Sequence, residues 1–301
     1  MRKRILVIDD EREQANALAA VLGRSLNDAE FMVASSESEI EEHINGKFYN
    51  LAILDIRMDD YQKSGIDWAK EIIEVNPFAK ILFVSKFLPE YLDLINDIMS
   101  TGRILAFSEK KEYTKWMEEL VPLINSYYKS ISMGNEINKA LVENYALARN
   151  ETDATKKGAM FENFVALLFN NIGYEVINKR VRDVSLNEVD LIIRNEIDDS
   201  FLEKFGKYIL VECKNKPEEP VCKNDFIVFQ NKLDATNGLA TLGFLFTTSK
   251  ITRNTYIEAV RESKGGNKVI FVDNGNMERM LTSPDMKEEL KRIIDSQVKD
   301  N

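Results

Sequence analysis

The stretch Tyr208-Ile209-Leu210-Val211-Glu212-Cys213-Lys214-Asn215 begins as a run of strand-forming residues and ends with an acid and a lysine two positions apart. Side chains alternate between the two faces of a strand, so Glu212 and Lys214 point to the same face. A carboxylate and an ammonium side by side at the end of an apolar strand indicate a functional site rather than a core. We therefore predict that chemistry takes place here, and that the other parts of the chain complete or control this site.

The composition is typical of a globular protein with room for two domains. The chain has 301 residues, of which 44% are hydrophobic and 30% are charged. No apolar run approaches the roughly 20 residues of a membrane span. The apolar run near the N-terminus ends in Asp9 and Asp10, which argues against a signal peptide. Two cysteines, Cys213 and Cys222, suit a reducing compartment, so we expect a cytoplasmic protein without membrane contact.

The charge is unevenly distributed. The formal net charge of -10 argues against a protein that coats nucleic acid through bulk charge. Residues 1–130 hold 16 Lys and Arg against 23 Asp and Glu, so the rest of the chain is nearly neutral and has room for a basic groove. The single histidine, His43, excludes His-based catalysis and His-rich metal sites.

Strands and helices alternate through residues 1–130. The strands are predicted at Arg4–Ile8, Glu30–Ala34, Leu51–Leu54, Ile81–Val84 and Ile104–Phe107. The helices are predicted to follow at Glu11–Ser25, after Ser36, from Ile66, at Leu88–Met99 and at Tyr113–Tyr128. Five βα units predict an α/β fold with a doubly wound, five-stranded parallel sheet. In such sheets, sites form beyond the carboxyl ends of the strands.

Acidic residues follow two of these strands. Asp9 and Asp10 come after the first strand, and Asp55 ends the third. Three carboxylates brought together would repel one another unless a divalent cation joins them, and an all-oxygen site suits Mg²⁺. Ser85 and Lys110, near the ends of the fourth and fifth strands, are suited to contact an added phosphoryl group.

With these residues in place, residues 1–130 resemble a response-regulator receiver domain of the CheY type. The resemblance implies that a sensor histidine kinase phosphorylates Asp55 and that Asp9, Asp10 and Asp55 hold Mg²⁺. It also implies that the conformational switch consists of Ser85, Phe107 and Lys110.

Three features depart from the receiver pattern. Met58 is followed by Asp59 where the family usually has proline, and Lys110 is followed by Lys111 rather than proline. The loop from Asp55 to Gly65 is also about two residues longer than is usual for the family. These changes leave the phosphorylation chemistry intact and bear on the shape of that loop and on kinase recognition.

Residues 131–157 are predicted to be a helical connector. One apolar stripe consists of Ile124, Tyr127, Tyr128 and Ile131, and a second of Ile137, Leu141 and Tyr145. A long apolar stripe needs a partner, which is either a flanking domain or the same helix of a second chain in a homodimer. The polar segment Arg149–Lys157 is predicted to be a linker or a helix N-terminus.

Residues 158–301 form a second α/β pattern. A helix is predicted at Gly158–Ile172, with strands after Gly173, at Glu188–Ile193 and at Tyr208–Lys214. A helix around Asp225–Thr236, a strand at Gly243–Phe246, a helix from Thr252, a strand at Val269–Val272 and terminal helices follow.

This order resembles the restriction-endonuclease fold of the PD-(D/E)xK superfamily. Its motif matches Asp190 on one strand and Glu212-Cys213-Lys214 on the next, and its helix glutamate matches Glu162. More narrowly, the chain resembles the Mrr-type branch in three blocks, which are Gly173–Val176, Leu245–Ser249 and Val269–Gly275. That branch often has glutamine at the position of Glu212.

The resemblance implies a metal-dependent endodeoxyribonuclease that uses Mg²⁺ or Mn²⁺. Asp190, Glu212 and the carbonyl of Cys213 would hold the metal, which neutralises a phosphate oxygen and polarises a water. Lys214 would orient or help deprotonate that water and offset charge in the transition state, and Glu162 would orient water. Basic residues suited to contact the DNA backbone are Lys179, Arg180, Arg182, Lys216, Lys223, Lys250 and Arg253.

The sequence thus predicts a two-component response regulator in which phosphorylation of Asp55 controls a DNA endonuclease. The alternative is a signalling protein whose second domain is an inactive nuclease fold that binds DNA or protein. The presence of Asp190, Glu212 and Lys214 together favours the enzyme.

Overall fold

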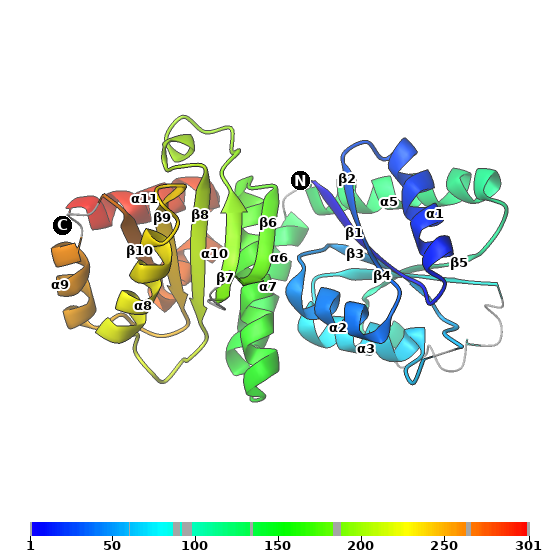
Figure 1. Ribbon diagram of the computed structural model, residues 1–301, viewed down its shortest axis with the longest axis horizontal. Coiled ribbons are helices and arrows are strands. Elements are labelled where there is room, and N and C mark those ends of the chain that lie inside the picture. The colour runs from blue at the N-terminus through cyan, green and yellow to red at the C-terminus, as the bar shows by residue number, and fades with distance from the viewer. Residues whose placement is uncertain are drawn as a thin grey trace. The chain divides into compact units, whose positions relative to one another are not determined.

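The computed structural model describes residues 2–59, 61–86, 91, 98–132, 135–182, 188–262 and 266–299 (Figure 1). The chain divides into two compact units, Met1–Ala140 and Leu141–Asn301. The boundaries predicted from sequence, with a connector at 131–157, stay a prediction.

The first unit contains a five-stranded parallel sheet in the order β2-β1-β3-β4-β5. Its strands are β1 (Lys3–Ile8), β2 (Ala29–Ala34), β3 (Leu51–Asp55), β4 (Lys80–Ser85) and β5 (Ile104–Glu109). Its helices are α1 (Arg12–Ser25), α2 (Glu37–Gly46), α3 (Gly65–Val75) and α5 (Tyr113–Ser132). Every residue of β1 and β3 is buried, as expected for central strands covered on both faces. The predicted doubly wound parallel sheet is confirmed.

Local capping fixes where the helices of this unit begin. The Ser36 hydroxyl accepts from the Glu39 N–H at the start of α2. Ser64 and Asp67 form a capping box at the start of α3, which satisfies two amide donors that the helix leaves unpaired. In Figure 1 the sheet lies between α1 and α5 on one side and α2 and α3 on the other. The helix predicted at Leu88–Met99 falls mostly outside the described residues.

The apolar stripe of α5 packs inside the first unit. The Tyr127 hydroxyl donates to the Asn50 carbonyl and the Tyr128 hydroxyl to the Arg4 carbonyl, each at 2.9 Å. Ile124 is fully buried. The unit's own sheet is therefore a partner for this stripe, which favours packing over a homodimer seam here. The homodimer itself stays a prediction.

The second unit contains a mixed sheet in the order β10-β9-β8-β7-β6. Its strands are β6 (Val176–Arg182), β7 (Glu188–Arg194), β8 (Tyr208–Lys214), β9 (Ala240–Thr247) and β10 (Lys268–Val272). The helices that surround it are α6 (Asn135–Asn150), which starts in the first unit, α7 (Ala154–Ile172), α8 (Lys223–Asp234), α9 (Arg253–Glu262), α10 (Asn274–Thr282) and α11 (Met286–Lys299). β6, β7 and β8 pair antiparallel, whereas β8, β9 and β10 pair parallel.

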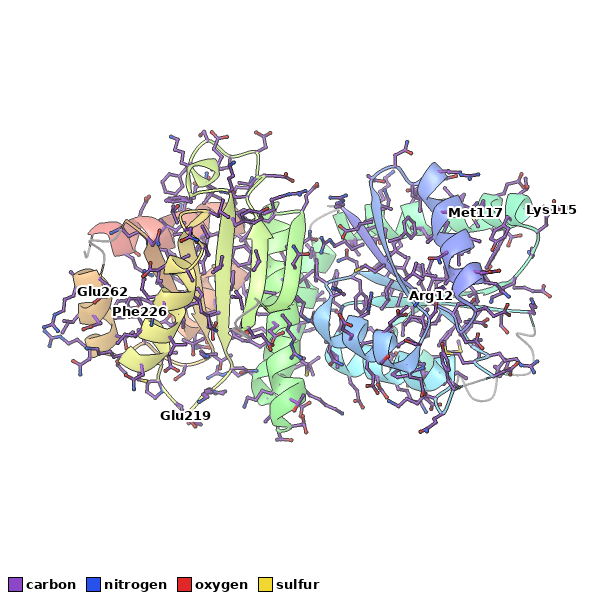
Figure 2. All side chains as sticks on the ribbon, in the orientation of Figure 1. Arg12, Lys115, Met117, Glu219, Phe226 and Glu262 are labelled. Carbon is purple, nitrogen blue, oxygen red and sulfur yellow. The ribbon has the colours of Figure 1, made fainter. Side chains whose placement is uncertain are left out.

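Side-chain alternation assigns the two faces of this sheet to different helices. Phe244 and Phe246 of β9 contact Phe169 of α7. Phe271 of β10 contacts Phe226 of α8, whose side chain is labelled in Figure 2. Apolar side chains thus pack on both faces of the sheet, and aromatic contacts join each face to its helix.

Helix α7 begins four residues before the predicted Gly158. The Asp153 side chain accepts from the Thr155 and Lys156 amides and caps the helix at Ala154. In the polar segment Arg149–Lys157, the first residues therefore end α6 at Asn150 and the last residues begin α7 at Ala154, with a short break between the two helices. None of the helices in the described ranges has the length and apolar character of a bilayer-spanning helix.

Two candidate functional sites

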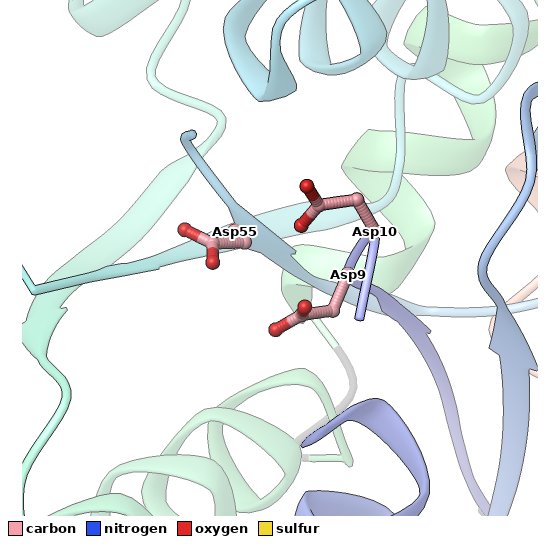
Figure 3. Close-up of side chains that lie close together, drawn as sticks. All are labelled: Asp9, Asp10 and Asp55. Atoms are coloured by element: carbon pink, nitrogen blue, oxygen red, sulfur yellow. The ribbon is translucent and has the colours of Figure 1, made fainter. Parts of the chain in front are cut away.

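Three aspartates meet at the carboxyl ends of β1 and β3. Asp9 and Asp10 directly follow β1, and Asp55 is the last residue of β3 (Figure 3). Each offers a carboxylate oxygen within 4.8 Å of the others. Asp9 and Asp55 are buried, and Asp10 is half-buried. In the described part of the chain, this is the only group of three or more acidic, histidine or cysteine ligands so closely spaced.

Lys110 joins these carboxylates from the loop after β5. Its Nζ lies 2.8 Å from Asp9 Oδ2, 2.5 Å from Asp55 Oδ2 and 3.2 Å from Gln14 Oε1. The Lys110 amide donates to the Ser85 carbonyl at 3.0 Å, which ties the two strand ends together. Asp9, Asp55, Ser85 and Lys110 thus converge as predicted from their strand positions. Gln14, one turn into α1, was missed because a lone glutamine carries no motif signal.

The electrostatics of the aspartate cluster favour an added cation. Burial raises the pKa of Asp55, and the hydrogen bond from Lys110 opposes that shift. Burial also raises the pKa of Asp10, against the hydrogen bond from the Asp59 amide. A divalent cation would relieve the cost of these buried negative charges, and the all-oxygen donor set suits Mg²⁺.

The loop after Asp55 is tied to the cluster at the position where the family usually has proline. The Asp59 N–H, which a proline would lack, donates to Asp10 Oδ2 at 3.1 Å. The Arg57 guanidinium pairs with the Asp59 carboxylate at 2.6 Å. A pocket of about 190 Å³ opens here, lined by Asp10, Glu11, Gln14, Asp55, Arg57, Asp59, Ser85, Lys86 and Lys110.

Ser85 and Phe107, the two other residues of the predicted switch, lie on the adjacent strands β4 and β5. Ser85 ends β4 and is buried. Phe107 of β5 is half-buried and stacks on Phe83 of β4 with the ring centroids 5.5 Å apart. This stacking joins Phe107 to the neighbouring strand β4.

The second candidate site lies where β6, β7 and β8 run side by side. Leu191 pairs with Val211, so continuing the antiparallel register by one step sets Asp190 opposite Glu212 on the same face. Asp190 Oδ2 accepts from the Cys213 amide at 2.6 Å, which fixes the aspartate against β8. The predicted Asp190 and Glu212 are therefore brought together across adjacent strands.

Glu212 is held by two lysines rather than one. Lys214 Nζ lies 2.8 Å from Glu212 Oε1, as expected for neighbours on one strand face. Lys232 Nζ, from α8, lies 2.8 Å from Glu212 Oε2. Sequence reasoning missed Lys232, because only the packing of α8 on β8 brings it to the site.

Glu162 of α7 is paired with Arg180 of β6. Arg180 Nε lies 2.9 Å from Glu162 Oε2, and its Nη2 lies 3.3 Å from Oε1, which makes a two-pronged contact. Arg180 has a φ of 46°, a left-handed conformation that is rare for a non-glycine residue. The β6–β7 ladder pairs Lys179 with Leu191 and Val181 with Val189, and no pair is formed between Arg180 and Asp190. The strained residue thus lies directly beside the candidate ligand Asp190.

Burial and neighbouring carboxylates act together on Asp190. Burial, together with the charges of Glu212 and Glu162, raises the pKa of Asp190 to about 7, against the lowering effect of the hydrogen bond from the Cys213 amide. Burial also lowers the pKa of Lys214, but Glu212 outweighs this and the pKa is raised. Crowded, desolvated carboxylates of this kind fit a divalent metal, since a cation removes their mutual repulsion.

The basic residues predicted to contact DNA fall into different environments. Lys179 is only 3% exposed, and its Nζ donates to Asn163 Oδ1 at 2.6 Å. It is therefore not a surface residue, and we withdraw it as a contact for the DNA backbone. Arg180 is engaged with Glu162, whereas Lys216 and Lys250 are exposed. Arg182 ends β6, and its side chain lies outside the described part.

Comparisons with known proteins match both parts of the chain. Residues 5–105 match the family model described as response regulator receiver domain, and residues 154–281 match the model described as restriction endonuclease, Mrr_cat. The chain is similar to a receiver domain in one part and to an Mrr-like restriction endonuclease in the other. The recognition of these two families from the sequence is thus confirmed. The unit Met1–Ala140 contains the receiver domain, and the unit Leu141–Asn301 contains the nuclease-like domain.

Several of the solved structures that are similar to the chain are receiver domains or response regulators. One is a CheY-like receiver domain protein from Methanospirillum hungatei JF-1, with 23% identity and a TM-score of 0.35, covering 43% of this chain and 99% of that chain. Another is a response regulator from Thermotoga maritima in complex with Mg²⁺ and BeF, with 27% identity and a TM-score of 0.31, covering 40% of this chain and 98% of that chain. Among curated proteins, nothing matches the chain.

Proposed function

We propose that this chain is a response regulator whose nuclease-like domain is a metal-dependent DNA endonuclease under the control of Asp55 phosphorylation. The observation that carries the enzymatic part is the convergence of Asp190, Glu212 and Lys214 at the ends of β7 and β8. They lie within the part that matches the restriction endonuclease model. A domain kept only for binding would not need all three side chains at one place.

Each residue has a defined task in this proposal. Asp190 and Glu212, with the Cys213 carbonyl, would hold Mg²⁺ or Mn²⁺. Bound there, the metal would neutralise a nonbridging phosphate oxygen and activate water. Lys214 places an ammonium beside these ligands, where it stabilises negative charge as it develops on the phosphate and orients the attacking water. Glu162 is held by Arg180 and would orient that water from α7.

The receiver domain supplies the control. A sensor histidine kinase would transfer phosphate to Asp55, with Mg²⁺ held by Asp9, Asp10 and Asp55. Lys110 already contacts two of these carboxylates, so a phosphoryl group on Asp55 would compete for its ammonium. Ser85 and Phe107 then change position, and the rearranged β4–β5 region alters assembly of the chain or access to the nuclease site.

Cleavage of supercoiled and linear DNA with Mg²⁺ or Mn²⁺ tests the enzymatic part. We expect cleavage by the wild-type chain and a loss of at least about 100-fold in Lys214→Ala. Lys291→Ala is the matched control, because Lys291 also pairs with a carboxylate, that of Asp199, at 2.7 Å but comes from α11 and belongs to no part of the motif. Equal cleavage by wild type and Lys214→Ala would contradict the proposed active site.

The alternative is an inactive nuclease fold that binds DNA or protein. One observation favours it: the Glu212 carboxylate accepts from Lys214 and Lys232, and the Asp190 carboxylate accepts from the Cys213 amide, so protein groups supply hydrogen bonds to both. Metal binding in the nuclease-like domain separates the two functions. Affinity that disappears in Asp190→Ala supports the enzyme, and no metal bound near Asp190, together with no cleavage, supports the binding module.

A further inference from the structure

Both oxygens of the Glu212 carboxylate are occupied by lysines. Lys214 takes Oε1 and Lys232 takes Oε2, each at 2.8 Å. The Glu212 side chain is 5% exposed and the Lys232 side chain is 15% exposed. Solvent therefore screens the ion pair between Lys232 and Glu212 only weakly. Lys214 belongs to the acid-x-lysine motif, whereas Lys232 comes from a helix and belongs to no motif in the chain.

The core holds Lys232 in this place. Strand alternation sets Glu212 on the same face as Leu210. Leu210 packs in one hydrophobic cluster with Phe229 and Leu233 of α8. Lys232 directly precedes Leu233 in the last turn of α8, where a cation is also favoured by the helix dipole. The contact with Glu212 therefore follows from how α8 packs on β8, rather than from a mobile surface side chain.

We propose that Lys232 is a positioning residue that holds the Glu212 carboxylate in place until a divalent cation binds, and that the cation displaces Lys232 from Oε2. A buried carboxylate needs a counter-charge, which Lys232 supplies together with Lys214. The same ammonium repels an incoming divalent cation, so Lys232 competes with the metal for Glu212. This inference rests on the proposed function, because it takes Glu212 as a metal ligand.

The competition has a measurable consequence. In wild type, metal binding must break the Lys232–Glu212 pair, whereas in Lys232→Met there is no pair to break. We therefore expect Lys232→Met to bind Mn²⁺ about tenfold more tightly than wild type. Lys232→Arg keeps the charge, and its affinity should stay close to that of wild type.

The experiment measures free Mn²⁺ by electron paramagnetic resonance during titration of the full chain. All variants carry Asp10→Asn, which removes one of the three receiver aspartates and weakens that separate site. Lys223→Met is the control on the same helix, since Lys223 pairs with Glu258 and not with Glu212. Circular dichroism melting establishes that each variant is folded, and Lys232→Gln replaces Lys232→Met if the latter is not.

The outcomes separate this inference from the proposed function. Tighter binding in Lys232→Met, with Lys223→Met unchanged, supports the inference. Unchanged or weaker binding in Lys232→Met, while Asp190→Ala still abolishes binding, overturns the role of Lys232 and leaves the nuclease site intact. Binding that is insensitive to Asp190→Ala overturns both.

Discussion

Gly65 lies so close to Asp55 that no larger residue fits. A Cβ at Gly65 would lie 1.9 Å from the Asp55 carbonyl oxygen and 2.9 Å from the Ile56 Cα. Both contacts are with backbone, which cannot rotate away, so Gly65→Ala must displace the phosphorylation site. We expect Gly65→Ala to lower the free energy of unfolding of the receiver domain by about 3 kcal/mol.

Urea unfolding followed by tryptophan fluorescence measures this effect selectively, since both tryptophans, Trp68 and Trp116, lie in the receiver domain. Gly46→Ala at the end of α2 is the control, because a Cβ there meets nothing within 4 Å. Equal midpoints for the two alanine variants would show that the close approach at Gly65 is wrong.

Lys179 gives the nuclease-like domain a dependence on pH. Burial lowers the pKa of Lys179 to about 8, whereas a lysine in the unfolded chain titrates near 10.4. Between about pH 8 and pH 10 the unfolded chain therefore binds a proton that the folded chain does not, and stability rises with pH.

Lys179→Met lacks this titration. Relative to that variant, the free energy of unfolding of wild type should rise by about 2 kcal/mol from pH 8 to pH 10. Urea unfolding followed by circular dichroism at several pH values measures the difference, with tryptophan fluorescence identifying the separate transition of the receiver domain. A difference that stays constant across this range would mean that the Lys179 ammonium is not buried as described.

At the scale of elements, β6 is the strand whose geometry is least ordinary. Arg180 adopts a φ of 46° in the middle of the strand, opposite Asp190. Glycine adopts such a conformation without strain, and alanine does not. We expect Arg180→Gly to be more stable than Arg180→Ala by about 1 kcal/mol, although both lose the pair with Glu162. Urea unfolding of the two variants makes the comparison, and a more stable alanine variant would argue for an ordinary strand.

The sequence predicted helices and strands well where a short apolar run or a capping residue marks them. The buried strand Leu51–Leu54 and the strand Tyr208–Lys214 follow from apolar runs, and the Ser36 cap follows from spacing. The start of α7 was placed late, at Gly158, because the polar segment Arg149–Lys157 was left open between a linker and a helix N-terminus. The spacing of apolar residues reveals the buried face of a helix, so it gives little information about where a helix with a polar first turn begins.

The candidate sites were predictable to the extent that motifs mark them. Asp55 and Glu212 stand at strand ends, which a parallel or mixed sheet brings together. The sequence did not predict that Lys232 contacts Glu212, because that contact depends on how α8 packs. It named Arg180 as a DNA contact but did not predict its pair with Glu162, which depends on a single left-handed residue. Lys179 was assigned to the surface by its charge alone, whereas its place in β6 buries it.

At the scale of the whole molecule, the proposed function combines two sites in one chain. The receiver domain has the buried Asp55 carboxylate, the proposed phosphorylation site, paired with Lys110. The nuclease-like domain offers two carboxylates and a lysine at adjacent strand ends. In the proposed function, phosphorylation of Asp55 changes the activity of the nuclease site. Such coupling requires that the two phosphorylation states differ in free energy at the nuclease site.

The most direct test of this coupling is the rate of supercoiled DNA cleavage with Mg²⁺, measured with and without beryllofluoride as a phosphoryl mimic. The wild-type chain and Asp55→Asn are compared under the same conditions. We predict that beryllofluoride changes the cleavage rate of the wild-type chain at least about fivefold and leaves the cleavage rate of Asp55→Asn unchanged. Equal wild-type rates with and without the mimic, in a chain that cleaves DNA, would contradict this coupling.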